Sequence, residues 1–247
     1  MERLQRPRPS EAHVWQVSVG SSSGLPGGWT RALSAGELAR AGSFRSPVDR
    51  LRYLGSRWWL RSVIGAYLGV DARLIEFGIS ARGKPWLASP AVGWLHFNIS
   101  HSQDRLAVAV ANSCEVGVDV EMVPDDPREI RDAISVLKPA ELEALAGCAT
   151  EQQRALRFYQ LWTRREAVLK ASGVGLGKPV REDFAAAMAG TPRAPSNARF
   201  ADPGETVSVA QLEFGPGFVG AVAANVNGAK LPTCASTLNP ENLLITG

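Results

Sequence analysis

Three acidic residues and one lysine have the types and spacing to hold a metal ion beside a phosphate. Asp119 and Glu121 lie two apart in EVGVDVEMV, and Glu166 and Lys170 lie four apart in LWTRREAVLKASG. Alternate residues of a strand point to one face, and residues four apart on a helix share one side. Neighbouring carboxylates repel each other, and a cation between them removes the repulsion. Because oxygen-only ligands suit a hard ion, the set favours Mg²⁺, which commonly keeps phosphate oxygens as its other ligands.

The elements that carry these residues are predicted to have one buried side. Valines alternate with the acids over 116–120, which is typical of a strand with one apolar face. On the predicted helix at 150–172, Phe158 and Trp162 lie on the same stripe as Glu166. Taken alone, the strand acids would more often face solvent, and the helical pair would be a surface salt bridge. A stripe that begins with two aromatics favours a site at the rim of a core.

Composition sets wider limits. The chain has 247 residues, of which 45% are hydrophobic, enough for the core of one large domain or two small ones. A net charge of +3 is too small to indicate nucleic-acid binding. Arginines are concentrated between Arg31 and Arg61, where Glu37 and Asp49 are the acidic residues. Such a segment suits a phosphorylated ligand or an acidic partner, although most single arginines there are expected to be surface charges.

Cysteine use and the N-terminal sequence bear on location. The three cysteines form no CxxC pair, and with three scattered histidines they give no zinc pattern. Their odd number fits a reducing compartment. The N-terminus has no apolar leader, and no apolar run is long enough to span a bilayer. We therefore expect a cytoplasmic protein with no membrane partner. We also expect a monomer with no nucleic-acid partner.

Hydrophobic periodicity and turn residues predict the order of elements. A strand is expected at 13–19, and a short helix at 34–41 begins with a capping box formed by Ser34 and Glu37. Beyond these, the sequence predicts a helix at 49–68, strands at 74–79, 95–100 and 105–112 with a turn at 101–104, the strand with Asp119 and Glu121, and helices at 127–137, 139–145 and 150–172.

One pattern occurs twice along the chain. A long Trp-bearing helix is followed later by a strand ending in LAVAVAN, and a second such helix by a strand ending in VGAVAAN. This repeated pattern predicts an α+β fold with two pseudo-symmetric halves, each a small, mainly antiparallel sheet packed on a long helix. The halves are expected at 1–112 and 113–227, with a loose tail at 228–247. No structure is predicted for 189–203, and the site is expected where the halves meet.

Four segments resemble a known family. FNISHS (97–102), GVDVE (117–121) and WTRREAVLKASG (162–173), preceded by RGKPWL (82–87), are similar in order and spacing to the 4′-phosphopantetheinyl transferases, in particular the larger, two-halved surfactin-synthetase type. The likeness extends over about 38–184. It implies coenzyme A bound between two pseudo-symmetric halves. It also implies transfer of the phosphopantetheine arm to a serine of an apo acyl or peptidyl carrier protein, with release of 3′,5′-ADP.

The resemblance also assigns residues. It implies Asp119, Glu121 and Glu166 as ligands of Mg²⁺, or of Mn²⁺, at the coenzyme A pyrophosphate. It makes Glu166, Lys170 and His101 the catalytic residues, with Glu166 as candidate base and the other two neutralising phosphate charge. The implied coenzyme A contacts are Arg40, Arg52, Arg82, Gly83, Lys84, Pro85, Asn98, Ser100, His101, Asp119, Glu166 and Lys170. Arg165 stands where the family usually has lysine, and we expect little effect because it lies off the Glu166 stripe.

Two other functions fit part of the pattern. A Mg²⁺-dependent nuclease or other phosphodiesterase could use the same acids, but the mild net charge does not favour it. The second alternative is a module of the same fold that binds carrier proteins without catalysis. The complete set of motif residues does not favour it.

The segment after the acidic strand is the predicted carrier-docking site. Over 122–137, Ile130, Ile134 and Leu137 could present an apolar stripe to a carrier helix, while Arg128 or Arg131 could meet acidic residues on the carrier. A core role for the apolar residues fits the sequence equally well.

Overall fold

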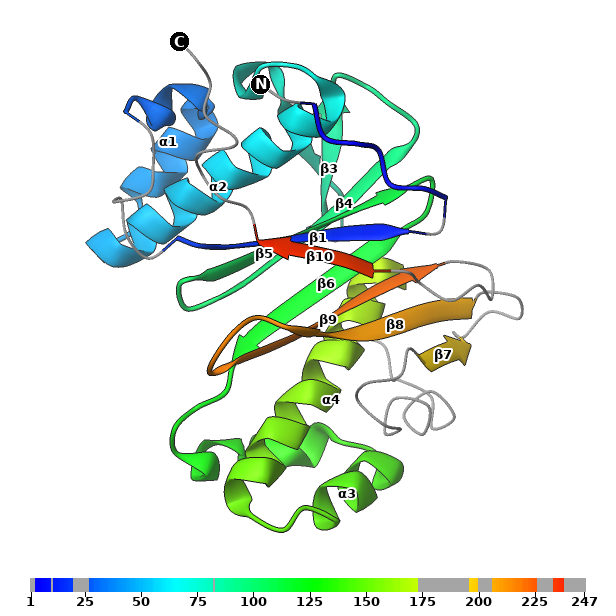
Figure 1. The fold of residues 1–247 in the computed structure, drawn as a ribbon. Helices are drawn as coiled ribbons and strands as arrows, with labels where there is room; N and C mark the ends of the chain where they lie inside the picture. Colours follow the sequence, from blue (N-terminus) through cyan, green and yellow to red (C-terminus); the bar gives the residue numbers. More distant parts are fainter. Residues whose placement is uncertain are drawn as a thin grey trace.

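A long helix covers the outer face of each of two four-stranded sheets, and the inner faces of the sheets meet each other (Figure 1). The computed structural model describes residues 3–9, 11–19, 27–81, 83–172, 196–199, 206–225 and 233–237. The first sheet has the strand order β10-β1-β5-β4 and the second the order β6-β9-β8-β7. Strands β2 and β3 form a separate two-stranded sheet. The molecule is therefore α+β, with layers in the order helix, sheet, sheet, helix.

The first half of the chain supplies the upper helix and most of the first sheet. Its elements are β1 (Ala12–Ser18), the 3₁₀ turn η1 (Trp29–Ala32), α1 (Ala35–Gly42), α2 (Pro47–Leu68), the 3₁₀ turn η2 (Ala72–Leu74), β2 (Glu76–Ile79), β3 (Pro85–Ser89), β4 (Leu95–Ser102) and β5 (Arg105–Asn112).

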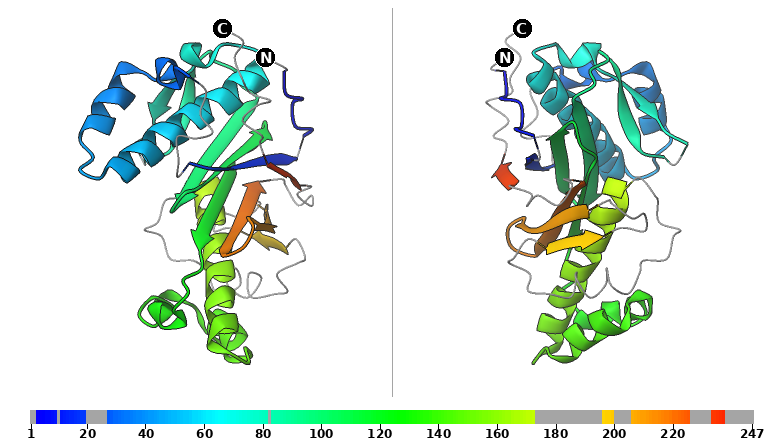
Figure 2. Two further views of the ribbon diagram at one scale, coloured as in Figure 1. Left: turned by 60° about the vertical axis from the view of Figure 1, so that its left-hand side comes forward. Right: turned by 90° about the vertical axis from the view of Figure 1, so that its right-hand side faces the viewer.

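The second half supplies the lower helix and the second sheet. Its elements are β6 (Val116–Met122), the 3₁₀ turns η3 (Pro127–Ile130) and η4 (Ala133–Val136), α3 (Pro139–Ala146), α4 (Glu151–Ser172), β7 (Ser196–Arg199), β8 (Thr206–Glu213), β9 (Phe218–Asn225) and β10 (Thr233–Thr237). Helix α3 and the first half of α4 extend beyond the sheets (Figure 2) and share a small core of their own.

Strand β5 shows why the layers form. Leu106, Val108 and Val110 pack against α2, whereas Ala107 and the alternate alanines after it face the second sheet. Successive strand residues point to opposite faces, so one apolar strand fills two cores at once. Small alanine side chains let the two sheets approach closely. The alternation of large and small apolar residues therefore sets which face meets a helix and which meets a sheet.

Helix boundaries follow their caps. The capping box predicted for α1 is present: the Ser34 side chain accepts from the Glu37 amide, and the Glu37 side chain accepts from the Ser34 amide. Helix α2 begins earlier than predicted because Ser46 caps it, with Pro47 at the first position. It ends at Gly69, whose φ of 70° is the left-handed conformation that glycine adopts readily.

Three element predictions were wrong in detail. The segment 127–137 is not one helix but the two turns η3 and η4, because the Asp126 side chain caps Arg128 and closes a tight first turn. The segment predicted as a strand at 74–79 begins with η2, capped by Asp71, and only β2 is extended. Strand β4 continues to Ser102, so the turn predicted at 101–104 is shorter.

The C-terminal part of the chain returns to the first half. Strand β10 lies parallel to β1, next to it in Figure 1, so the tail is not loose over 233–237. Strand β7, within the stretch for which no structure was predicted, pairs with β8. The boundaries predicted for the two halves, at 1–112 and 113–227, remain a prediction. Within the described residues, no helix is long and apolar enough to cross a membrane.

Candidate functional site

The two strand acids face α4, as the alternation predicts. Val116, Val118 and Val120 enter the core between the sheets. Asp119 is buried on the other face, where the Lys170 ammonium lies 2.6 Å from its Oδ1 and also donates to the Val118 carbonyl at 3.1 Å. The predicted helical lysine and the predicted strand acid therefore form a direct ion pair.

Gly117 lets α4 come this close to β6. A Cβ at this position would overlap the carbonyl oxygen of Ala167 and lie 2.8 Å from the Cβ of Lys170. Any larger residue would push the last turns of α4 away from the strand. The glycine of the GVDVE motif thus sets the distance between Lys170 and Asp119, a role that sequence reasoning missed.

Polar side chains on β4 bridge to β6 at the edge where the two sheets meet. Asn98 Oδ1 accepts from the Val118 amide at 2.9 Å, and Ser100 Oγ donates to Asp119 Oδ1 at 2.9 Å. Ser102 Oγ donates to Glu121 Oε2 at 2.8 Å. These three residues alternate along one face of the strand, and each bridges to a different part of β6. The motif FNISHS contains all three residues, but the contact of Ser102 with Glu121 was not predicted, although the spacing N-x-S-x-S was a visible signal.

Burial makes the acids costly to ionise. Burial raises the pKa of Asp119, although Lys170 acts in the opposite sense, and burial also raises the pKa of Glu121. For Glu166, burial and the nearby Asp119 charge raise the pKa to about 7. Asp119 Oδ2 is buried without a hydrogen-bond partner in the structure. If all three acids were ionised, the site would carry more negative charge than Lys170 balances, and a bound cation would favour that state.

The acids do not form a complete ligand cluster. Over the described ranges, no group of three or more His, Cys, Asp or Glu side chains is arranged to hold a metal ion. Asp119 is instead engaged by Lys170 and Ser100 through one oxygen. The chemistry of the donors fits a hard cation, since all are carboxylates and one buried oxygen lacks a partner.

A cavity of about 320 Å³ lies between α2 and the end of β4. It is lined in part by Arg52, Tyr53 and Ser56 of α2 and by His101 of β4. The Arg52 Nε is buried without a hydrogen-bond partner, and its Nη1 lies 3.6 Å from Asp49. The structure therefore brings the predicted residues Arg52 and His101 together. Arg40 is exposed, with its guanidinium carbon 5.8 Å from the centre of the Tyr53 ring, and does not line this cavity.

A second cavity, of about 450 Å³, lies beside the loop between β2 and β3. Lys84 and Pro85 line it together with Phe97, His96 and Glu115. Gly83 in this loop has a φ of 81°, which favours glycine. Arg82 lies outside the described residues. His96 and Glu115 were absent from the sequence-based assignment.

Arg165 makes its contacts with the segment before α3 and with α3 itself. Its Nη1 donates to the Val136 carbonyl at 2.8 Å and lies 3.9 Å from Glu141. The prediction that this side chain lies off the Glu166 stripe is confirmed. Arg165 ties α4 to the segment before α3, and arginine can do this as well as lysine.

The apolar docking stripe was a wrong prediction. Ile130 and Leu137 are buried in the core that α4 shares with α3, and Ile134 is partly buried against it. A short segment without a regular helix needs buried anchors, which these residues provide. Within residues 122–137, the exposed large apolar residues are Met122 and Val136.

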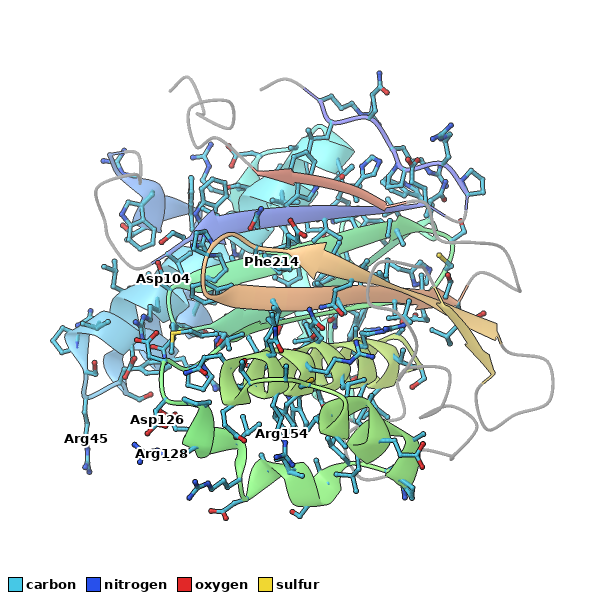
Figure 3. The ribbon with its side chains drawn as sticks, turned by 60° about the horizontal axis from the view of Figure 1, so that its bottom comes forward. Arg45, Asp104, Asp126, Arg128, Arg154 and Phe214 are labelled. Atoms are coloured by element: carbon cyan, nitrogen blue, oxygen red, sulfur yellow. The ribbon has the colours of Figure 1, made fainter. Side chains whose placement is uncertain are left out.

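The basic residues of the same segment remain exposed. Arg128 and Asp126 lie side by side there (Figure 3), with Arg128 Nη2 2.7 Å from Asp126 Oδ2. Arg131 is exposed next to them. Of the predicted docking surface, the two arginines are therefore exposed and the apolar stripe is not.

The comparisons with known proteins bear on the same residues. Residues 115–219, which include β6 and α4, match the 4′-phosphopantetheinyl transferase superfamily, and residues 28–114 match the N-terminal region of a 4′-phosphopantetheinyl transferase. The 4′-phosphopantetheinyl transferase HetI of Nostoc sp. is 36% identical over 173 residues, which are 68% of this chain and 71% of HetI. The chain belongs to the 4′-phosphopantetheinyl transferase superfamily.

Other relatives of this transferase agree. A 4′-phosphopantetheinyl transferase of Bacillus subtilis is 33% identical over 60% of this chain and 64% of its own length. The transferase AcpT of Salmonella typhimurium is 32% identical over 65% of this chain and 75% of its own length. The transferase therefore moves the phosphopantetheine arm of coenzyme A to a carrier protein, as the sequence motifs predicted.

Proposed function

We propose that the transfer takes place where β4, β6 and α4 meet, with the coenzyme A pyrophosphate beside Asp119, Glu166 and Lys170. The observation that carries this proposal is the geometry of Asp119. Lys170 and Ser100 converge on Oδ1, while Oδ2 is buried and has no partner. An anionic group with an unused buried oxygen beside a lysine suits a cation and a phosphate together.

Asp119, Glu121 and Glu166 would hold Mg²⁺, with Mn²⁺ as an alternative. When bound, the ion would neutralise charge on the pyrophosphate and on the departing phosphate. Ser100 and Ser102 hold two of the three carboxylates from the β4 side, so both acids reach the ion from fixed positions. The absence of a ready ligand cluster among the described residues fits ligands that complete their arrangement when coenzyme A and the ion arrive together.

Glu166 would take the proton of the carrier serine. The serine oxygen forms a bond to the phosphorus that carries the pantetheine arm, the bond from that phosphorus to the bridging oxygen breaks, and 3′,5′-ADP leaves. In the metal-free protein, burial and the Asp119 charge raise the pKa of Glu166 to about 7, which favours proton acceptance, whereas a bound cation would act in the opposite sense. Lys170 and His101 would balance charge on the phosphates, since both groups donate to anionic oxygens.

The two cavities suit the nucleotide end of coenzyme A. Arg52 and His101 would contact the 3′-phosphate, which the buried, unpartnered Arg52 Nε supports. The loop with Gly83, Lys84 and Pro85 would hold the adenine beside Phe97. We retain Arg40, Arg82 and Asn98 as proposed coenzyme A contacts. Arg82 lies outside the described residues, and Asn98 also fixes β6 against β4.

We further propose that the carrier protein docks on the exposed segment after β6. Met122 and Val136 supply exposed apolar surface. Arg131, and Arg128 when it exchanges Asp126 for a carboxylate of the carrier, supply positive charge among the acidic residues of the segment, which are Asp125, Asp126, Glu129 and Asp132. A cytoplasmic monomer that binds neither nucleic acid nor membrane remains part of the proposal.

A mass measurement tests the proposed function. The protein is incubated with an apo carrier protein, coenzyme A and Mg²⁺, and the carrier is weighed intact. A gain of one phosphopantetheine, lost when a chelator replaces Mg²⁺, is the expected result. No gain with any of several acyl and peptidyl carriers would contradict the proposal, and cleavage of a nucleic acid under the same conditions would favour the phosphodiesterase instead.

A further inference from the structure

The Lys84 ammonium joins the two halves of the chain. Its Nζ donates to Glu115 Oε2 at 2.6 Å, to the Lys170 carbonyl at 3.0 Å and to the Val116 carbonyl at 3.3 Å. An ammonium group has three donors, and all three are used. Lys84 therefore cannot donate to a phosphate without giving up one of these partners.

Glu115 is the charged partner in this junction. Its second oxygen, Oε1, lies 3.0 Å from His96 Nδ1, so one carboxylate connects the β2–β3 loop to the start of β4. Its main-chain carbonyl accepts from the Asn225 amide at 3.1 Å, which anchors Glu115 to the second sheet. Hydrogen bonding by His96, and then by Lys84, lowers the pKa of Glu115 to about 2. The carboxylate is therefore ionised throughout the physiological pH range.

The position of this junction points to ligand binding more than to stability. The Glu115 side chain is half exposed, and an exposed ion pair contributes little to the free energy of unfolding. Yet Lys84, His96 and Glu115 all line the cavity of about 450 Å³ beside the β2–β3 loop. One of the Lys84 acceptors is the main-chain carbonyl of Lys170, whose ammonium contacts Asp119. The junction thus fixes the cavity relative to the acids.

We infer that Glu115 is a positioning residue for coenzyme A: it holds Lys84 against the end of α4 and so sets the distance between the nucleotide cavity and Asp119. The inference rests on the proposed function, since it takes this cavity to receive the adenine end. In this role the Lys84 ammonium binds protein groups, while the backbone of its loop lines the cavity.

A competing role for Lys84, as a phosphate ligand, predicts the opposite change in coenzyme A affinity when Glu115 is removed. If the ammonium were a phosphate ligand, removing Glu115 would free it and remove a negative charge, and coenzyme A would bind more tightly. If Glu115 positions Lys84, removing either side chain weakens binding, and removing both is no worse than removing one. The effect of Glu115→Ala on affinity therefore separates the two roles.

The experiment measures the Kd of coenzyme A by calorimetry, together with kcat and both KM values. The variants are Glu115→Ala, Lys84→Met and the double variant, with Glu115→Gln in case a larger change perturbs folding. The matched control is Glu151→Ala, which removes an exposed carboxylate 3.8 Å from Arg154. Residues 151 and 170 are about 28 Å apart along α4, so this control lies far from the junction.

We expect Glu115→Ala and Lys84→Met each to raise the Kd and KM for coenzyme A about threefold. Glu115→Gln should lie between wild type and Glu115→Ala, and the double variant should match the weaker-binding single variant. The kcat and the KM for the carrier should stay within about twofold of wild type, because Glu115 touches no reacting atom. Tighter binding by Glu115→Ala, multiplying effects in the double variant, or an equal effect of Glu151→Ala would each overturn the inference. Wild-type protein that binds no coenzyme A would overturn the proposed function itself.

Discussion

At the scale of single residues, the site holds charge that the fold does not balance. Burial raises the pKa values of Asp119 and Glu166, the Asp119 charge adds to the rise for Glu166, and Lys170 supplies one compensating positive charge. Proteins keep such costly groups where a ligand needs them. Substitutions here are therefore expected to harm activity more than stability.

Replacing Asp119 with Asn tests this separation. Asparagine keeps the shape but removes the charge that pairs with Lys170 and would attract Mg²⁺. We expect carrier modification to fall about a thousandfold, with Tm within a few degrees of wild type, because the buried charge is itself costly. Intact-mass kinetics and thermal unfolding give the two readings. Near-normal activity at ordinary Mg²⁺ concentrations would remove Asp119 from the proposed metal ligands.

Replacing Glu166 with Gln tests the proposed base. Glutamine keeps one metal-capable oxygen but cannot accept the serine proton. We expect kcat to fall about a hundredfold or more while the Kd of coenzyme A changes little, because the lost interaction belongs to the transition state. If affinity is lost instead and returns at high Mg²⁺, Glu166 is a ligand and the base lies elsewhere.

In metal-free buffer, the difference in Tm between Glu166→Gln and wild type should depend on pH. The pKa of Glu166 is raised in the folded protein, so ionisation is disfavoured there relative to the unfolded chain. Wild-type stability is therefore lost as the pH rises from the ordinary carboxylate range towards 7, whereas the glutamine side chain of the Glu166→Gln variant does not titrate. The Tm advantage of Glu166→Gln should grow between about pH 5 and pH 8. An advantage that does not change with pH would contradict the raised pKa.

At the scale of elements, the contact between β6 and α4 is what brings the proposed catalytic groups together. Helix α4 delivers Glu166 and Lys170 to the face of β6 that bears Asp119, and Gly117 makes the approach possible. On the other side, the alternating polar residues of β4 hold the edge of β6. The strand acids are thus held by α4 on one side and by β4, a strand of the first sheet, on the other.

Gly117→Ala tests the importance of that close approach. The added methyl group overlaps the Ala167 carbonyl, so α4 must move away from β6. We expect a loss of about 1–3 kcal/mol in the free energy of unfolding, together with a loss of activity, since Lys170 leaves Asp119. Gly42→Ala is the control, because nothing lies within 4 Å of its added methyl group. Equal Tm losses in the two variants would contradict this account.

The elements also show how far the sequence could lead. Periodicity and caps predicted the two long helices and the acidic strand because those signals are local, and Ser34 and Glu37 form the expected capping box. They failed at 127–137, where buried anchors such as Ile130 decide the path of the chain. The pairing of β10 with β1 and the contact of Lys84 with Glu115 join distant segments, and no local pattern encodes them.

At the scale of the whole molecule, the proposed site lies where β4 of one sheet meets β6 of the other, and the proposed carrier surface lies to one side of it. The halves meet face to face, so neither sheet alone carries a complete site. The segment after β6 leaves this junction and passes below the sheets beside α4 (Figure 3). A carrier docked there would bring its serine to the strand that carries Asp119 and Glu121.

Charge reversal on this segment tests the docking surface. Arg128→Glu combined with Arg131→Glu turns two exposed positive charges into negative ones, which would repel an acidic carrier. We expect the KM for the carrier to rise about tenfold, with the KM for coenzyme A unchanged, and the effect to shrink at high salt.

The chain offers a closely matched control for that experiment. Arg73 pairs with Asp71 as Arg128 pairs with Asp126, two residues apart and with Nη2–Oδ2 distances of 2.6 and 2.7 Å. Arg73→Glu breaks the same kind of local ion pair on the first half, far along the chain from the docking segment. A rise in carrier KM for the docking variant alone would support this surface, because loss of an Asp–Arg pair is common to both. The comparison is therefore made between Arg73→Glu and Arg128→Glu alone, since each replaces one positive charge with one negative charge, whereas the double variant does so twice. Equal rises for these two single variants would mean that net charge governs the encounter, and the carrier would then have to dock elsewhere.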